Sequence, residues 1–425
     1  MYKLICLFFC IHIFTWASAQ ETLTLEDCRQ RVINYNPTLK KQGKEVESSE
    51  ANMQANRKDY FPTFDMSGNY TYLQHPQQVI VNDTKIDAAQ SMYLLNAPLM
   101  QNIYSGGAVR KRNEMALLQN NLAISNKDYT EDNLLLQTEL AFWSSIYNEE
   151  MINLSSKYKD AIDGLVIVIK DKVDFEIISR NDLLLLEVRQ NEAELFKLMT
   201  RNKFEVSIME LNRIIGNPVE SELQVSGDLS GNEKSVDTIS LSSVYSIRPE
   251  LISQRNRIDM QITNADLTKA NYLPNVYAGI IPSWGVPNTN IGGTDPVYNT
   301  SFVAGVNIPI VRWGKKKHDV KKEMSLAQAK TYELQEIKDK VTLEVHSANY
   351  QLEETIIRKE LTEASLEKAV TNLDIMTDRY LEGLTSILEV LDAQLYWQRA
   401  FKDMLDARLL YKMAIAYHKK AVGLI

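Results

Sequence analysis

The chain has 425 residues, with 47 lysines and arginines against 55 aspartates and glutamates, which gives a formal net charge of -8 at pH 7. Because phosphate backbones are bound by basic faces, this balance argues against a nucleic-acid partner. The cysteines are Cys6, Cys10 and Cys28, and the first two lie in an N-terminal segment that we expect to be removed, so no intramolecular disulfide is predicted.

That N-terminal segment has the features of an export signal. Lys3 precedes an apolar run over residues 4–16, and Ala-Ser-Ala at 17–19 is typical of a signal-peptidase site. We therefore predict that residues 1–19 are a signal peptide. No later stretch of the sequence approaches the roughly 20 apolar residues that a membrane-crossing helix needs. Any membrane-spanning segments of this exported chain are therefore expected to be strands.

The second half of the sequence repeats motifs of the first half in the same order, which predicts an internal duplication. Two early motifs are displaced by 212 positions (36 to 248), and two later ones by 207 positions (179 to 386). The matching pairs are Asn36-Pro37-Thr38-Leu39 with Arg248-Pro249-Glu250-Leu251, Tyr60-Phe61-Pro62 with Tyr272-Leu273-Pro274, Ser179–Leu184 with Ser386–Leu391, and Gly216 with Gly423. We predict a first repeat at 20–216, a linker at 217–240 and a second repeat at 241–425.

Each repeat is predicted to run helix, strand, loop, strand, long helix, tip and helix. Residues 25–59 are expected to form one helix. Residues 64–73 then alternate, with Phe64, Met66, Tyr70 and Tyr72 on one face and Asp65, Ser67, Asn69 and Thr71 on the other. This alternation is typical of a membrane-barrel strand. Weaker strand patterns follow at 91–99, 275–281 and 301–308, and the long polar loops at 74–90 and 283–300 suit the extracellular side.

Aromatic and basic residues flank the predicted strands. Belts of Tyr and Trp at headgroup level would produce this aromatic pattern, but so would ordinary sheet-forming aromatics. Basic clusters follow the second strand of each repeat, where they are either solvated helix surface or contacts for phospholipid headgroups. The aromatic residues are Tyr60, Phe61, Tyr93, Tyr104, Tyr272, Tyr298 and Trp313, and the clusters are Arg110-Lys111-Arg112 and Lys315-Lys316-Lys317.

Two stretches, residues 108–161 and 316–381, contain neither glycine nor proline and carry apolar residues at helical spacing. At ~1.5 Å per residue, helices of this length reach on the order of 80 to 100 Å. Such helices do not form a compact globule, so we predict a bundle, a coiled coil or a helical barrel. The fold class is therefore mainly α with a small β part.

Four strands per chain cannot close a membrane-spanning sheet. Backbone polar groups in hydrocarbon must all be paired, so the sheet needs a barrel without open edges. Single-chain bacterial barrels begin at about eight strands and have even strand numbers. Closure is therefore expected to come from assembly, with twelve strands in a trimer or eight in a dimer.

These features resemble the TolC-type outer-membrane efflux protein family over residues 23–423. The resemblance rests on the duplication, on the prolines at turns between helices and strands, and on the segment Gly383-Leu384-Thr385-Ser386-Ile387-Leu388-Glu389-Val390-Leu391-Asp392-Ala393. It implies a homotrimer in which a shared twelve-stranded transmembrane β-barrel joins a long helical-hairpin barrel. The turn prolines are Pro62, Pro98, Pro274 and Pro309.

The resemblance also implies a function and site residues. In the family, Glu389 and Asp392 would form acidic rings at a pore constriction, Gly383 would form a tip turn, and Asp182 and Tyr380 would join neighbouring tips. The competing interpretation of both acids is ordinary exposed helix surface. Thr385 stands where the best-known member has an arginine, so one charged link is missing. Glu176 stands where glycine is usual, so the first tip turn is expected to differ from the second.

The implied protein is a passive gated duct in the bacterial outer membrane, whose helical barrel extends into the periplasm. It would export small molecules together with a periplasmic adaptor protein and an inner-membrane pump of the resistance-nodulation-division or ABC type, and its barrel would contact outer-membrane lipid. One alternative is a type I protein-secretion duct, and another is a periplasmic coiled-coil scaffold without a pore. An enzyme, a metal site and a cofactor are not expected, because the five histidines are scattered and no nucleophile elbow or phosphate loop is present.

Overall fold

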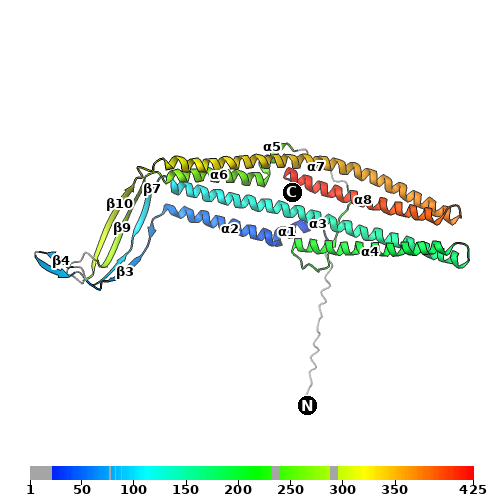
Figure 1. Cartoon of the computed structure of the whole chain (residues 1–425), viewed down its shortest axis with the longest axis horizontal. Coiled ribbons are helices and arrows are strands. Elements are labelled where there is room, and N and C mark those ends of the chain that lie inside the picture. The colour runs from blue at the N-terminus through cyan, green and yellow to red at the C-terminus, as the bar shows by residue number, and fades with distance from the viewer. Residues whose placement is uncertain (1–21, 76–77, 82, 88, 232–238, 288–294) are drawn as a thin grey trace, which may run out of the picture. The chain divides into compact units, whose positions relative to one another are not determined.

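The computed structural model describes residues 22–75, 78–81, 83–87, 89–231, 239–287 and 295–425 (Figure 1). The predicted signal peptide, residues 1–19, lies outside them. The chain forms two compact units. Unit 1 comprises residues 1–40, 130–240 and 342–425, and unit 2 comprises residues 41–129 and 241–341. Each unit therefore contains corresponding parts of both predicted repeats.

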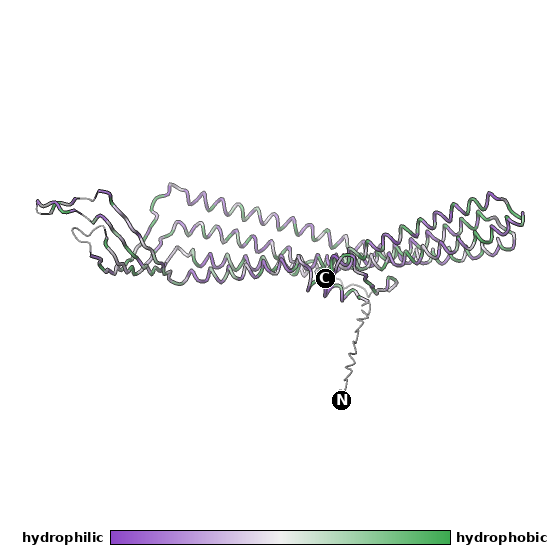
Figure 2. Tube along the Cα trace, turned by 90° about the horizontal axis from the view of Figure 1, so that it is seen from below, coloured by the Kyte–Doolittle hydropathy of each residue, from purple (hydrophilic) through white to green (hydrophobic). Residues whose placement is uncertain are grey.

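The long helices of the two halves have equal lengths. Helices α3 (Ala108–Asp174) and α7 (Lys315–Leu381) both have 67 residues, and α4 (Arg180–Ile215) and α8 (Ile387–Val422) both have 36. In Figure 1, α3 turns back into α4 and α7 into α8. Figure 2 shows apolar and polar positions interleaved along these helices. The predicted class, mainly α with a small β part, is confirmed, with the 207-position displacement preserved at every boundary of these helices.

The predicted helix over residues 25–59 is wrong in one respect, because it is broken at Asn36. Helix α1 (Leu25–Tyr35) ends there and α2 (Pro37–Arg57) begins, followed by a 3-10 turn, η1 (Lys58–Tyr60). Asn36 is extended (φ -63°, ψ 123°), the conformation imposed on a residue before proline. The second half repeats the break, since Arg248 (φ -62°, ψ 121°) separates α5 (Leu241–Ile247) from α6 (Pro249–Ala270).

Unit 1 has two large buried clusters and a smaller one around Met151 and Met404. One lies under a short parallel pair, β1 (Thr22–Leu23) with β8 (Gln224–Val225), and contains Cys28, Phe142 and Leu211. The other gathers the ends of α3, α4, α7 and α8 and contains Tyr158, Leu186, Tyr380 and Val390. The two helical tips of one chain therefore share a core. Because this core contains residues of both tips, the packing of each tip stabilises the position of the other.

Unit 2 contains the sheet. Strand β9 (Asn275–Val286) pairs antiparallel with β10 (Val297–Asn307) on one side and with β6 (Ser91–Asn96) and β7 (Leu99–Ser105) on the other. Strands β3 (Ser67–Tyr72) and β2 (Thr63–Phe64) pair with β6 and β7. The sheet therefore has β10 at one edge and β2 with β3 at the other.

All four predicted strand regions are present, but their bounds differ from the prediction. The first is interrupted at residues 65–66, and the second continues past Leu99 to Ser105. The polar loop at 74–90 contains a small hairpin of β4 (Gln78–Val81) and β5 (Thr84–Asp87), which the sequence pattern did not predict.

The placement of Pro98 at a strand-to-helix turn is also wrong. Pro98 lies between β6 and β7, and its carbonyl oxygen accepts the Asp65 N–H at 3.1 Å. A proline has no N–H for the ladder, so it interrupts the strand without ending it. The turn into α3 is formed by Gly106 and Gly107, both with positive φ (64° and 85°).

Candidate functional site

The three other turn prolines lie between helix and strand. Pro62 stands between η1 and β2, Pro274 between α6 and β9, and Pro309 between β10 and α7. Proline suits these positions because it disfavours continuation of a helix. It also has no N–H, and none is needed for pairing outside the strands.

Both tip turns have the same conformation. Glu176 and Gly383 are left-handed, with φ of 56° and 76°. In each turn a backbone bond closes the preceding helix: the N–H of Ile177 donates to Lys172 O at 2.9 Å, and the N–H of Leu384 donates to Arg379 O at 2.8 Å. The expectation that Glu176 would change the first turn is therefore wrong. The hairpin geometry imposes the left-handed conformation on a residue that adopts it at a cost of about 1–2 kcal/mol.

Glu389 caps its own helix. Ser386 is the N-cap of α8, and the Glu389 carboxylate accepts the Ser386 backbone N–H at 3.1 Å in a capping box. Asp182 occupies the equivalent third helical position of α4, after the N-cap Ser179. Asp392 is exposed one turn further along α8. The two acids of the predicted constriction thus lie on one helical end, and Glu389 has a structural role that the sequence pattern did not assign.

Tyr380 lies inside the tip core. Its side chain is 7% exposed, and its hydroxyl is buried without a hydrogen-bond partner among the described residues. The Lys172 ammonium lies 4.4 Å from the ring centroid, within cation–π range. Burial, and then the charge of Asp182, raise the pKa of the Tyr380 hydroxyl. Tyr380 is thus within electrostatic reach of Asp182, although its hydroxyl does not bond to that carboxylate.

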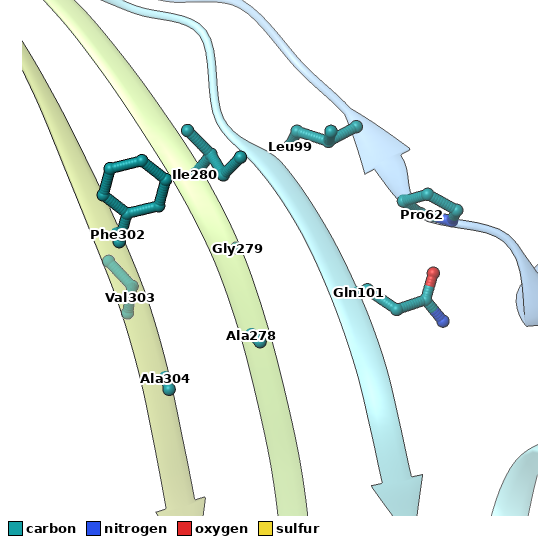
Figure 3. Close-up of a pocket in the computed structure, with 9 residues that line it drawn as sticks. All are labelled: Pro62, Leu99, Gln101, Ala278, Gly279, Ile280, Phe302, Val303 and Ala304. Atoms are coloured by element: carbon teal, nitrogen blue, oxygen red, sulfur yellow. The ribbon is translucent and has the colours of Figure 1, made fainter.

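One face of the sheet is apolar across all four strand regions. Residues directly opposite each other on antiparallel strands share a face. Phe302 of β10 lies opposite Ile280 of β9, Ile280 opposite Leu99 of β7, and Leu99 opposite Phe64 of β2. Phe302 is 81% exposed and Phe64 is 68% exposed. Figure 3 shows Phe302, Ile280 and Leu99 side by side, and together with the small residues Ala278 and Ala304 they line an open, mostly apolar groove.

The opposite face is mostly polar or small. Tyr277 is one of its larger residues, and its ring lies across Gly305, where a Cβ would stand 2.3 Å from a ring carbon. The polar positions of this face are Ser67, Asn69, Thr71, Asn96, Asn102, Asn275, Asn299, Ser301 and Asn307. Its apolar positions Met92, Leu94, Met100, Ile281 and Val303 are half-buried. A sheet with one apolar and one polar face separates two media, provided that the apolar face meets lipid.

Two features are absent from the described residues. Within the described ranges, no helix combines the length and apolar content needed to cross a bilayer. The same ranges contain no group of three or more His, Cys, Asp or Glu side chains able to hold a metal ion.

Comparison with known proteins gives consistent results. Residues 241–423 match the family model described as outer membrane efflux protein. The chain is 19% identical to the outer membrane protein TolC of Salmonella enteritidis, over 100% of this chain and 86% of that protein. The resemblance to the TolC-type outer-membrane efflux family is confirmed.

Solved TolC-type channels have the same fold. The outer membrane channel CmeC of Campylobacter jejuni superimposes with a TM-score of 0.81 at 16% identity, covering 94% of this chain and 85% of that one. The MtrE outer membrane channel of Neisseria gonorrhoeae, solved in an open state, gives a TM-score of 0.80 at 18% identity, with 94% and 89% coverage. The helical hairpins and the two-faced sheet described above are therefore the architecture of these channels.

Sequence reasoning missed two tip features. The capping box was readable as Ser-x-x-Glu at 386–389, which is a known helix-start signature. The position of Lys172 over Tyr380 was not readable, because it depends on how α3 and α7 pack together.

Proposed function

We propose that the chain is one protomer of a trimeric outer-membrane duct that exports small molecules in a tripartite efflux system. The observation that carries the proposal is the sheet, which combines an exposed apolar face with two unpaired edges. The protein is localised to the outer membrane, and its helical hairpins extend into the periplasm. The predicted repeat boundaries (20–216 and 241–425) are part of this proposal, since each repeat contributes one pair of strand regions and one helical hairpin.

The edges are suited to closure by copies of the same chain. Strand direction alternates across the sheet, so β10 runs opposite to β2 and β3. The β10 edge of one copy can therefore pair antiparallel with the β2–β3 edge of the next, and all backbone groups are satisfied without an open edge. Three copies with four strand regions each give 3 × 4 = 12 strands. TolC-type channels form homotrimers, which favours this number over a dimer of eight.

The helical tips are the proposed gate and docking region. Apolar side chains are exposed at both turns: Phe175 (77%), Ile177 (67%) and Leu384 (64%). Exposed apolar clusters of this kind mark interaction sites, and the proposed partner is a periplasmic adaptor that links the duct to a resistance-nodulation-division or ABC pump. Contacts of Asp182 and Tyr380 with neighbouring copies are part of the same proposal, as is contact of the sheet with outer-membrane lipid.

Glu389 and Asp392 are proposed to line the constriction. In a trimer they contribute 3 × 2 = 6 carboxylates around the axis, and acidic rings favour cations over anions. The test is single-channel recording in planar bilayers. A Glu389→Gln, Asp392→Asn double variant should reduce cation selectivity and weaken block by multivalent cations, because the charge is lost while the introduced glutamine amide oxygen still accepts the Ser386 N–H.

A matched variant separates charge from fold. Glu389→Ala removes the charge and also the capping-box bond to the Ser386 N–H, at a cost of about 1 kcal/mol of helix stability, so it should both change selectivity and increase spontaneous opening. Unchanged selectivity in the double variant would remove both acids from the constriction. Recovery of the protein in the soluble periplasmic fraction would refute the duct and favour the scaffold alternative. A protein-secretion duct has the same architecture, and export of a small fluorescent substrate by cells carrying the chain with its own pump distinguishes the two.

A further inference from the structure

The start of α7, in unit 2, carries a concentration of positive charge. Lys269, Lys316, Lys317 and Lys321 line one pocket together with Gly314. Lys269 forms an ion pair with Asp266 at 2.8 Å. Among the described residues, Lys316, Lys317 and Lys321 form no ion pair, and the first turn of α7 contains no acidic residue. The nearest acid on α7 is Asp319, whose carboxylate accepts the Tyr272 hydroxyl, and Glu323 pairs with Lys322. Three neighbouring ammonium groups therefore lie together without an ion pair among the described residues.

In the equivalent region of the first repeat, two cations of the Arg110-Lys111-Arg112 cluster form ion pairs. Lys111 contacts Glu114 at 2.9 Å and Asp266 at 3.1 Å, and Arg112 lies 3.6 Å from Asp59. Two of the three unpaired lysines have no basic counterpart there, since the residues 207 positions before Lys316 and Lys321 are Val109 and Glu114. Like charges at helical spacing repel each other. The uncompensated charge at α7 is therefore a specific feature of the second repeat, and an anion from outside the chain would relieve it.

Trp313 is a second, independent feature of the same place. It is left-handed (φ 46°) and 95% exposed, and Gly314 follows it with φ 77°. The equivalent residue is Gly106, where a Cβ would stand 2.7 Å from the Ala270 carbonyl oxygen, so glycine is required there. A tryptophan in the left-handed conformation is strained, and such strain is typically kept at functional positions. An indole with an apolar body and a polar N–H suits the boundary between membrane and water.

The apolar face of the sheet leads directly to this position. Phe302 and Val306 of β10 lie on that face, and the chain beyond the strand exposes Ile308 (57%) and Ile310 (88%) before it reaches Trp313. A long ligand lying along this surface would contact apolar side chains over most of its length and lysines at the end that lies against α7. That order matches an acyl chain followed by a charged headgroup.

We propose that Trp313, Lys316, Lys317 and Lys321 bind the headgroup of an anionic phospholipid, with Ile308 and Ile310 against its acyl chains. The site rests on the proposed membrane function, and it names the lipid class that the start of α7 selects. Three ammonium groups are enough to neutralise the one or two negative charges of a phospholipid headgroup. Lysines near the membrane surface are attracted to anionic lipids, so anionic headgroups should be preferred over zwitterionic ones on the order of tenfold.

The test is fluorescence quenching in vesicles. A Trp284→Phe background is used because Trp284 lies on the lipid-facing side of the sheet, whereas Trp143 and Trp397 lie in clusters of unit 1. The full mature protein is reconstituted in phosphatidylcholine vesicles that contain increasing mole fractions of either brominated phosphatidylglycerol or brominated phosphatidylcholine. Phosphatidylglycerol should quench Trp313 at about tenfold lower mole fraction.

The key variant is Lys316→Gln, Lys317→Gln, Lys321→Gln, which should lose this preference. A charge-matched control removes three exposed lysines of unit 1, by Lys170→Gln, Lys203→Gln and Lys368→Gln, and should retain it. Replacing Lys316 and Lys321 by their first-repeat counterparts, valine and glutamate, should also abolish the preference and guards against a folding defect specific to the triple variant.

Several outcomes would overturn the site. Equal quenching by the two lipids would do so, as would a preference that survives in the triple variant. A preference abolished by millimolar inorganic phosphate would assign the lysines to a free anion and not to a lipid. Conductance of the same vesicles reports on the duct separately: a conducting protein without lipid preference counts against the headgroup site alone, and a preference without conductance counts against the duct alone.

Discussion

The two tip turns allow the cost of a left-handed residue to be measured within one chain. Gly383 has φ 76°, and a Cβ added there would meet nothing within 4 Å. Gly383→Ala therefore introduces backbone strain without a steric clash. The strain is about 1–2 kcal/mol, and the lower entropy of alanine in the unfolded chain offsets about 0.4–1 kcal/mol, so a net loss of about 1 kcal/mol is expected.

This loss should be local, because the turn bonds close only the tip. Hydrogen exchange at the Leu384 amide, which donates to Arg379 O at 2.8 Å, reports directly on opening of the turn. A loss of about 1 kcal/mol corresponds to roughly fivefold faster exchange. Glu176→Gly should slow hydrogen exchange at the Ile177 amide. The change should be smaller, because glycine also makes the unfolded chain more flexible and this opposes the gain in stability.

Gly164→Ala is the matched control. Gly164 lies inside α3, has no neighbour within 4 Å of an added Cβ, and should gain about 1 kcal/mol of helix stability. The reasoning fails if Leu384 exchange is unchanged in Gly383→Ala. It also fails if Gly164→Ala accelerates exchange at the tips as Gly383→Ala does.

Three further predictions concern unit 1. Arg29→Ala leaves the 1%-exposed Glu139 carboxylate without its partner at 2.5 Å and should cost about 3–5 kcal/mol in urea unfolding, whereas Arg213→Ala, at an exposed pair, should cost less than about 1 kcal/mol. Cys28 is fully buried, and burial raises the pKa of its thiol to about 12, so maleimide at pH 8 should label it only after denaturation; rapid native labelling would contradict the packing. Burial lowers the pKa of His418, so the folded chain binds a proton at this residue more weakly than the unfolded chain does. The free energy of unfolding should therefore fall as pH drops below about 6.5, and His418→Gln should make it less dependent on pH between about pH 7 and 5. The same pH dependence in the variant would exclude His418 as its source.

The parts of the fold that the sequence predicted are those set by local pattern. Period-two alternation around Phe64 and the absence of glycine and proline after Ala108 determine strand and helix without reference to tertiary contacts. The break at Asn36 was also readable, because a residue before proline is restricted to extended conformations. The helical prediction over residues 25–59 gave too little weight to Pro37.

The remaining features depend on contacts between distant segments. Glu176 is left-handed because two antiparallel helices must be joined, although its own propensity opposes this conformation. The hydroxyl of Tyr380 lacks a partner among the described residues because four helix ends pack around it. The lack of ion pairs at Lys316, Lys317 and Lys321 among the described residues becomes visible only when the ion pairs of Lys111 and Arg112 in the first repeat are known. Such features follow from packing, which a single sequence does not encode in any short pattern.

Strand β9 has a consequence for how such an assembly can diversify. It is the first strand of the second repeat, and it pairs with β7 of the first repeat, so the two halves meet through the same kind of edge contact that closure between copies requires. In the proposed ring of copies, covalent fusion of the halves means that the two kinds of half alternate. The two halves can then carry different residues at equivalent positions. The second half has Gly383 at its tip turn and lysines without ion pairs at the start of α7, and the first half has Glu176 and ion-paired cations. Identical half-size subunits would have the same residue at each of these positions, so such differences could not arise.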